Sequence, residues 1–212
     1  MKDSERAAKA LLNAKAVFLR PSEPFTWASG IKSPVYCDNR LLLGYPAIRA
    51  EIEELLKNLI EREYPGAEVL MGTSTAGIPH AAIVAEKTGL PMGYVRSGNK
   101  DHGRQNRIEG ASPEGKKTVI VEDLISTGGS VIEVAEALRE AGAEVMGIAS
   151  LFTYGLRKGI DRLAAANLKN VSLSDFETLS RVALDEKYIT PEEYEMVSAF
   201  RADPNGNWYE KA

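Results

Sequence analysis

The sequence predicts an α/β fold in which a central parallel sheet is flanked by helices. From residue 68 onward, short apolar segments alternate with segments of helical spacing, which is typical of parallel strands joined by crossover helices. The strands are almost continuously apolar, as at residues 118–121, and this pattern is typical of a sheet covered on both faces. The 212 residues are 44% hydrophobic and 26% charged, so we expect one domain over residues 1–212 with a full core.

The first part of the chain is predicted to be mixed. Residues 4–14 and 47–63 have the spacing of amphipathic helices. Between them, residues 18–38 hold short strands that are interrupted by Pro21, Pro24, Gly30 and Pro34. The aromatic residues of this stretch either line a flat-ring pocket or pack as a hairpin, and their spacing leaves both alternatives open.

Repeated strand–helix units are predicted for residues 65–175, which form the expected ligand-binding core. We expect strands at residues 68–71, 92–95, 117–121, 144–152 and 171–173, and helices at 78–87, 129–140 and 155–166. Two terminal helices follow, and the second begins at the N-cap residue Thr190, before Pro191. Because ligands of such sheets bind at the carboxyl ends of strands, the turns after residues 71, 95 and 121 are the candidate sites.

Charge and composition exclude several classes of protein. The net charge of −4 gives no chain-wide attraction to nucleic acid or to an anionic membrane. No apolar run approaches the roughly 18 residues of a membrane span, and the charged N-terminus lacks a signal-peptide core. Cys37 is the only cysteine, so we expect no internal disulfide and a reducing, cytoplasmic location. Cys37 lies in a strand-like stretch, where packing explains it better than catalysis.

The most informative segment is residues 119–130. An apolar strand leads to the adjacent carboxylates Glu122 and Asp123, and a run of hydroxyls and glycines then begins a helix. Glycines let the backbone turn tightly, and successive N–H groups at a helix N-terminus bind anions. Carboxylates accept hydrogen bonds from sugar hydroxyls, so the segment suits a phosphorylated ribose. It matches neither the Walker loop nor the dinucleotide motif. The plainer alternative is a helix N-cap with solvated acids.

Two further turns are candidates for binding anions. Residues 96–107 carry Arg96, Lys100, Arg104 and Arg107, and a long basic loop with glycines is typical of a lid over an anionic leaving group. The alternative is a solvated basic loop. The small-residue turn at 72–77 suits an anion or a plain strand-to-helix connection, and His80 behind it is expected to be a packed or capping histidine.

Residues 119–130 resemble the signature of the type I phosphoribosyltransferases, which binds 5-phosphoribosyl 1-diphosphate (PRPP). The resemblance extends along nearly the whole chain to the orotate phosphoribosyltransferases, particularly the branch of Gram-positive bacteria, through residues 25–34, 72–78, 94–96 and 100–103. It implies the type I phosphoribosyltransferase fold, with a small N-terminal hood formed by residues 1–45 and parts of the C-terminal end. It also implies a homodimer in which the 96–107 loop reaches the neighbouring subunit's site.

The resemblance implies that PRPP and orotate react to give orotidine 5′-monophosphate and pyrophosphate in pyrimidine biosynthesis, with Mg²⁺ as cofactor and no assigned protein ligand for the metal. It makes Lys100, His102 and Asp123 catalytic, and Ser126 a contact of orotate. The expected PRPP-binding residues are Arg96, Lys100, His102, Glu122, Asp123, Leu124, Ile125, Ser126, Thr127, Gly128, Gly129 and Ser130. The expected pyrophosphate turn consists of Thr73, Ser74, Thr75, Ala76 and Gly77.

The chain departs from the family pattern at several cationic positions. Many members have lysines where Ala28, Ala76 and Ser97 stand here, and other branches have an orotate-binding arginine near residues 152–154. Arg20, Lys32 and Arg40 are the cations left for the orotate carboxylate. A phosphoribosyltransferase for another base, or a PRPP-binding regulator of nucleic acid, would share the PRPP segment; the acidic balance argues against the regulator.

Overall fold

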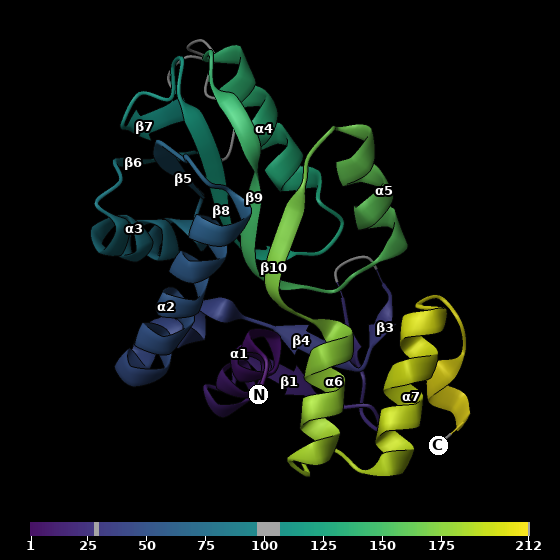
Figure 1. The fold of residues 1–212 in the computed structure, drawn as a ribbon. Coiled ribbons are helices and arrows are strands. Elements are labelled where there is room, and N and C mark those ends of the chain that lie inside the picture. Colours follow the sequence, from purple (N-terminus) through teal and green to yellow (C-terminus); the bar gives the residue numbers. More distant parts are fainter. Residues whose placement is uncertain (28–29, 97–106, 212) are drawn as a thin grey trace. The chain divides into compact units, whose positions relative to one another are not determined.

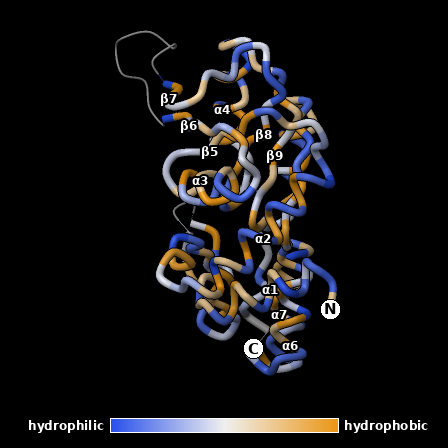
Figure 2. The backbone as a smooth tube through the Cα atoms, turned by 60° about the vertical axis from the view of Figure 1, so that its left-hand side comes forward, coloured by the Kyte–Doolittle hydropathy of each residue, from blue (hydrophilic) through white to orange (hydrophobic). Residues whose placement is uncertain are grey.

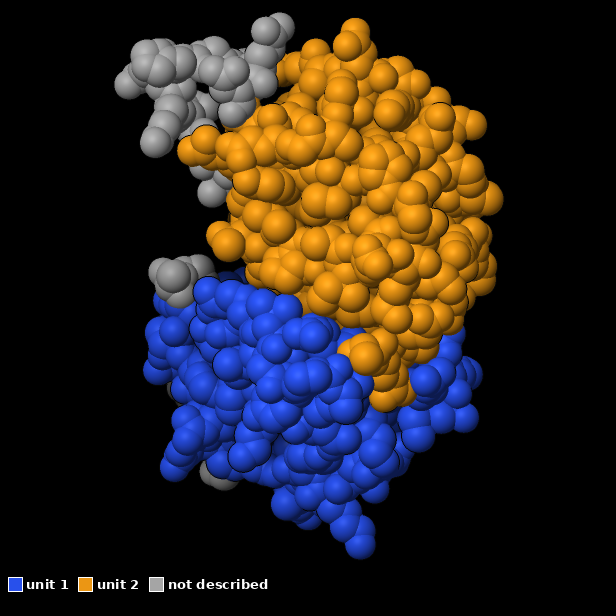
Figure 3. All heavy atoms as spheres, turned by 90° about the vertical axis from the view of Figure 1, so that its left-hand side faces the viewer, with its two compact units in different colours: residues 1–49, 174–212 blue, residues 50–173 orange. Residues whose placement is uncertain are grey.

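The computed structural model describes residues 1–27, 30–96 and 107–211 (Figure 1). The chain divides into two compact units, which Figure 3 distinguishes by colour. Unit 1 comprises residues 1–49 and 174–212, and unit 2 comprises residues 50–173. The single domain expected over residues 1–212 stays a prediction.

Unit 2 is built on a sheet of order β10-β9-β8-β5-β6-β7. Its strands are β5 (Val69–Thr73), β6 (Met92–Val95), β7 (Ile108–Gly110), β8 (Lys117–Ile125), β9 (Glu144–Thr153) and β10 (Asn170–Asp175). The pairs β5–β6, β5–β8 and β8–β9 are parallel, and the pair β6–β7 is antiparallel. This arrangement, flanked by helices, confirms the predicted α/β fold class.

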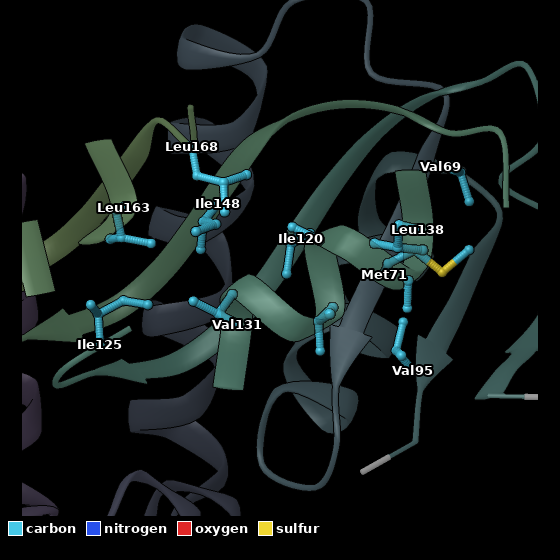
Figure 4. Close-up of a cluster of buried hydrophobic side chains, with 13 residues drawn as sticks. Val69, Met71, Val95, Ile120, Ile125, Val131, Leu138, Ile148, Leu163 and Leu168 are labelled. Carbon is cyan, nitrogen blue, oxygen red and sulfur yellow. The ribbon is translucent and has the colours of Figure 1, made fainter. Parts of the chain in front are cut away.

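Helices complete unit 2, namely most of α2 (Pro46–Glu63), α3 (Gly77–Thr88), α4 (Gly129–Glu140) and α5 (Arg157–Ala165). One core cluster joins the sheet to α4 and α5: Met71, Ile120 and Ile148 from three strands pack with Leu138 and Leu163 (Figure 4). Hydrophobic stretches run through β8 and β9 in the hydropathy view (Figure 2). Burial of this apolar surface fixes the strand ends, and therefore the turns that leave them.

Unit 1 combines three helices with two small ribbons. Its helices are α1 (Asp3–Asn13), α6 (Phe176–Asp185) and α7 (Pro191–Ala202), and its short 3-10 turns are η1 (Asn39–Gly44) and η3 (Trp208–Lys211). Antiparallel pairs join β1 (Val17–Leu19) to β4 (Val35–Cys37), and β2 (Phe25–Thr26) to β3 (Lys32–Ser33). Edge-to-face contacts join Trp27 and Trp208 to Phe200. Trp27, one of the aromatic residues of the stretch 18–38, therefore contributes to packing. Thr190 caps α7 as predicted, accepting from the amide of Glu193.

Two strands differ from the expectation. The short edge strand β7 lies within the polar stretch 96–116, where only a loop was expected, because three residues of Ile-Glu-Gly carry no recognisable period. Strand β8 continues to Ile125 instead of ending at residue 121, because residues 122–125 pair with β9 as far as Thr153. The acid pair therefore lies within the strand, and the bend begins at Ser126.

Candidate active site

Two helix N-termini lie at the same edge of the unit 2 sheet. Strands β5 and β8 are parallel neighbours, with Gly72 opposite Val121. The turn from β5 into α3 and the bend from β8 into α4 therefore leave the same edge of the sheet, where β8 extends beyond the end of β5. Helix N-termini present unpaired N–H groups and a partial positive charge, so this edge suits a ligand with two anionic groups.

The bend at residues 126–130 has the properties of a phosphate site. Gly128 has φ of 75°, a conformation that glycine adopts without strain, and it caps α4. Among the hydrogen bonds within the described part of the chain, none uses an amide of residues 126–130 as donor. Ser126, Thr127 and Gly129 are half-buried, Gly128 is buried and Ser130 is exposed, so part of the bend lies at the surface.

Helix α5 supports this bend. A side-chain carbon at Gly159 would lie 2.5 Å from the carbonyl oxygen of Ser126. Only glycine allows this close approach, since real Cβ atoms do not come so near to another heavy atom. The same approach brings Leu163 to 3.3 Å from the position of a Cβ at Gly128. The backbone of the bend is thus held by the packing of α5.

The two acids of β8 occupy different environments. Glu122 is 6% exposed, and its Oε1 accepts from the Thr73 hydroxyl at 2.8 Å and from the Asp123 amide at 2.9 Å. Burial, a hydrogen bond with the Asp123 carboxyl and the charge of that carboxyl raise the pKa of Glu122 to about 8. Asp123 is only half-buried. Glu122 is therefore an internal group, and Asp123 is the more accessible of the two acids.

The turn after β5 uses its hydroxyls unequally. Thr73 is 4% exposed and Ser74 donates to the carbonyl oxygen of Val95 at 2.7 Å, so both side chains are engaged inward. Thr75 is exposed, and the Ser74-Thr75 peptide bond is cis. The pyrophosphate turn predicted at 73–77 therefore offers an anion the Thr75 hydroxyl and the start of α3, but not the Thr73 hydroxyl.

Arg96 directly follows β6 and belongs to a polar cluster with residues of β7. Its guanidinium lies 3.0 Å from Glu109 Oε1, and its amide donates to the carbonyl oxygen of Arg107 at 2.8 Å. The Tyr94 hydroxyl donates to the other oxygen of Glu109. Hydrogen bonds from Tyr94 and Arg96 lower the pKa of Glu109. No pattern in the sequence indicates Glu109, because its contacts depend on the pairing of β7 with β6. Lys100 and His102, predicted to be catalytic, lie outside the described residues.

The three candidate cations for a carboxylate all lie in unit 1, and each has a contact. Arg40 forms a two-pronged pair with Asp38, at 2.6 and 2.8 Å. Arg20 lies over the ring of Phe25, 5.6 Å from its centroid. Lys32 donates to the Thr26 hydroxyl at 2.9 Å. These contacts leave the carboxylate-binding residue among the three open.

His80 lies outside this constellation, as expected for a packed histidine. It is 1% exposed on α3, and its Nδ1 lies 2.6 Å from Oε1 of Glu53, which is fully buried on α2. Glu53 Oε2 and His80 Nε2 have no hydrogen-bond partner among the residues that the structure describes. The pair joins two helices and contacts neither the acid pair nor the bend in any hydrogen bond of the described chain.

Known proteins share this architecture. A profile of the phosphoribosyl transferase domain matches residues 42–187. An orotate phosphoribosyltransferase from Bacillus pumilus is 55% identical over 207 residues, covering 97% of this chain and 98% of that protein. The crystal structure of orotate phosphoribosyltransferase from Aeropyrum pernix matches with a TM-score of 0.74 at 31% identity, covering 86% of this chain and 99% of that one. UMP synthase of Leishmania donovani matches with a TM-score of 0.82 at 29% identity over 94% of this chain, which spans only 42% of that protein.

The fold and the domain profile, which covers more than half of the chain, thus define a phosphoribosyltransferase. The chain belongs to the orotate phosphoribosyltransferase family.

Proposed function

We propose that this chain transfers the 5-phosphoribosyl group from PRPP to orotate, giving orotidine 5′-monophosphate and pyrophosphate in the synthesis of UMP. One observation of the structure carries the PRPP part of this proposal. Five consecutive amides without acceptors in the described chain, at residues 126–130, lead from β8 into α4, near the half-buried carboxylate of Asp123. The choice of orotate rests on the identity of 55% with the B. pumilus enzyme.

The bend at 126–130 binds the 5-phosphate in this mechanism. The acid pair, Glu122 and Asp123, accepts hydrogen bonds from the ribose hydroxyls. Binding energy from the phosphate, which does not react, positions the reacting carbon. As pyrophosphate leaves, positive charge develops on the ribose ring, as in glycosyl transfer. Lys100, His102 and Arg96 stabilise the negative charge on the leaving group, and Ser126 contacts orotate.

Mg²⁺ fits this site as a partner of the substrate. Within the described residues, no group of three or more His, Cys, Asp or Glu side chains could form a cage for a metal ion. Mg²⁺ prefers substrate phosphate oxygens and water to a cage of protein carboxylates, so when bound with the diphosphate it would neutralise part of the charge of that group. The chain itself supplies the acceptors that hold the ribose in place.

Assembly and location follow from the same proposal. We expect a homodimer in which residues 96–107 serve the neighbouring subunit's site, and a cytoplasmic enzyme. Among the described helices, none combines the length and the apolar character that crossing a bilayer requires.

The test is an absorbance assay of orotate consumption with PRPP and Mg²⁺. We expect turnover that requires all three components and reverses on addition of pyrophosphate to orotidine 5′-monophosphate. Consumption of hypoxanthine, adenine or uracil instead of orotate would support the alternative of another base. Absence of turnover with every base, together with PRPP-dependent retention of RNA or DNA on filters, would support the regulator.

A further inference from the structure

A single hydroxyl connects the two anion-binding segments of unit 2. Thr73 ends β5 at the start of the turn into α3, and Glu122 lies near the end of β8 before the bend into α4. The Thr73 hydroxyl lies 2.8 Å from Glu122 Oε1 and 3.3 Å from the carbonyl oxygen of Val121. A hydroxyl has one proton to donate, and the shorter contact to the carboxylate is the stronger one when Glu122 is ionised.

Little else holds the Glu122 carboxyl. It is 6% exposed, and among the described residues its hydrogen-bond partners are Thr73 and the neighbouring Asp123. The charged group that acts on Glu122 is Asp123 on the same strand. Strand β5 contributes the uncharged Thr73, and the first turn of α4 carries no acid. No cation contributes to its environment among the described residues. A buried carboxyl in such surroundings depends strongly on each donor that remains.

The absence of a side chain at Gly77 leaves room for the Thr73 hydroxyl. A Cβ at Gly77 would lie 2.4 Å from Thr73 Oγ1 and 2.4 Å from the carbonyl oxygen of Val121. The first residue of α3 is therefore packed directly against the Thr73 hydroxyl. This close packing holds the hydroxyl in the direction of Glu122 and joins the start of α3 to the acid pair.

We propose that Thr73 is a positioning residue for the acid pair: its hydroxyl fixes the Glu122 carboxyl, and Glu122 in turn orients Asp123 toward the ribose hydroxyls of PRPP. This inference rests on the proposed function. It replaces the direct pyrophosphate contact expected of the Thr73 side chain with an indirect role, and it couples the leaving-group turn to the ribose acids through one hydrogen bond.

The experiment compares the full-length protein with Thr73→Val, which removes the hydroxyl at nearly constant volume, and Thr73→Ser, which retains it. We expect Thr73→Val to raise KM for PRPP about tenfold, the upper range of the effect of losing one buried hydrogen bond. KM for orotate should change less than about twofold, and Thr73→Ser should stay within about threefold of the wild type for both substrates.

Thr118→Val is the matched control. Thr118 is also fully buried in the central sheet, but its hydroxyl donates to the carbonyl oxygen of Lys116 at 3.1 Å, at the opposite end of β8. It should leave KM for PRPP unchanged. If Thr73→Val does not fold, as judged by circular dichroism, Thr73→Ala takes its place, since it removes the same hydroxyl without adding a methyl group.

The pH profile separates positioning from packing. The Thr73 hydroxyl lowers the pKa of Glu122, so its loss lets the acid pair retain a proton to higher pH. The pH at which KM for PRPP improves should move upward in Thr73→Val and stay in place in Thr73→Ser. An equal rise of KM at every pH, an unchanged KM in Thr73→Val, or an equal loss in Thr73→Ser would overturn the inference. Inactivity of the wild-type protein would instead overturn the proposed function.

Discussion

At the scale of the residue, the main finding is that two adjacent carboxylates have different roles. Glu122 and Asp123 follow one another on β8 and their carboxyls share a hydrogen bond, but they differ in burial. Glu122 is buried and bonded to Thr73, whereas Asp123 is half-buried at the edge where the helix N-termini lie. The sequence predicts that both belong to the site, but it does not distinguish them, because the Thr73 contact crosses from β5 to β8.

Asp123→Asn tests the accessible acid. An amide nitrogen cannot accept the hydrogen bond that a carboxylate oxygen accepts from a sugar hydroxyl, so we expect PRPP to bind at least about tenfold more weakly in calorimetry. Asp161→Asn is the control, because Asp161 pairs with Arg157 on the exposed face of α5. Equal PRPP affinity in the wild type and Asp123→Asn would refute the ribose role.

Glu122 makes the stability of the fold depend on pH. Its pKa is raised to about 8 in the folded chain, from an ordinary value of 4.5. Between these values the folded chain holds a proton that the unfolded chain has lost. This stabilisation is fully present below about pH 4.5 and is lost as pH rises through about 8, at no more than about 1.4 kcal/mol per pH unit.

Denaturant unfolding of the wild type and Glu122→Gln measures this effect. Since glutamine does not titrate, the difference in unfolding free energy between the two isolates Glu122 from the other ionisable groups. We expect the advantage of the wild type over Glu122→Gln to shrink by about 1 kcal/mol for each pH unit between about pH 5.5 and 7.5. A difference that stays constant over this range would show that Glu122 is ionised in the folded chain.

At the scale of the element, the strands and helices of unit 2 were largely predictable, because their apolar periods are strong. Helix α4 begins at Gly129 and ends at Glu140, as predicted. The extension of β8 past residue 121 was not predictable, because Glu122 and Asp123 break the apolar run while still pairing with β9. The support of the bend by Gly159 was also hidden, since it depends on how α5 packs against the strands.

Gly159→Ala tests that support. The added Cβ would meet the Ser126 carbonyl oxygen at 2.5 Å, so the bend or α5 must shift. We expect ribose 5-phosphate to bind about tenfold more weakly while circular dichroism remains that of the wild type. In Gly44→Ala the new Cβ has no neighbour within 4 Å, so that variant should bind like the wild type. Unchanged binding in Gly159→Ala would mean that the bend does not depend on α5.

At the scale of the whole molecule, one buried polar pair joins two helices. The buried pair of Glu53 on α2 and His80 on α3 has no hydrogen bond with the acid pair in the described chain. The sequence could not pair these residues, which are separated by 27 positions. Nor could it rank the cations for orotate, because Arg20, Lys32 and Arg40 differ only in contacts that folding creates.

Glu53→Leu should lower the free energy of unfolding by about 3 kcal/mol, because it leaves His80 buried without its partner. The double change Glu53→Leu and His80→Phe should recover much of this loss, since two apolar groups can replace a buried polar pair. Thermal unfolding of the two variants and of His80→Phe gives the coupling between the residues. Additive effects would contradict a mutual dependence of the pair.

The central claim is that the amides at residues 126–130 bind the 5-phosphate of PRPP. The most direct measurement is an amide NMR titration of the ¹⁵N-labelled protein with ribose 5-phosphate, followed by orotidine 5′-monophosphate. We expect the amide signals of Ser126, Thr127, Gly128, Gly129 and Ser130 to shift most, saturably and with one dissociation constant. If those five signals stay in place while others move, the phosphate binds elsewhere and this account of the site is wrong.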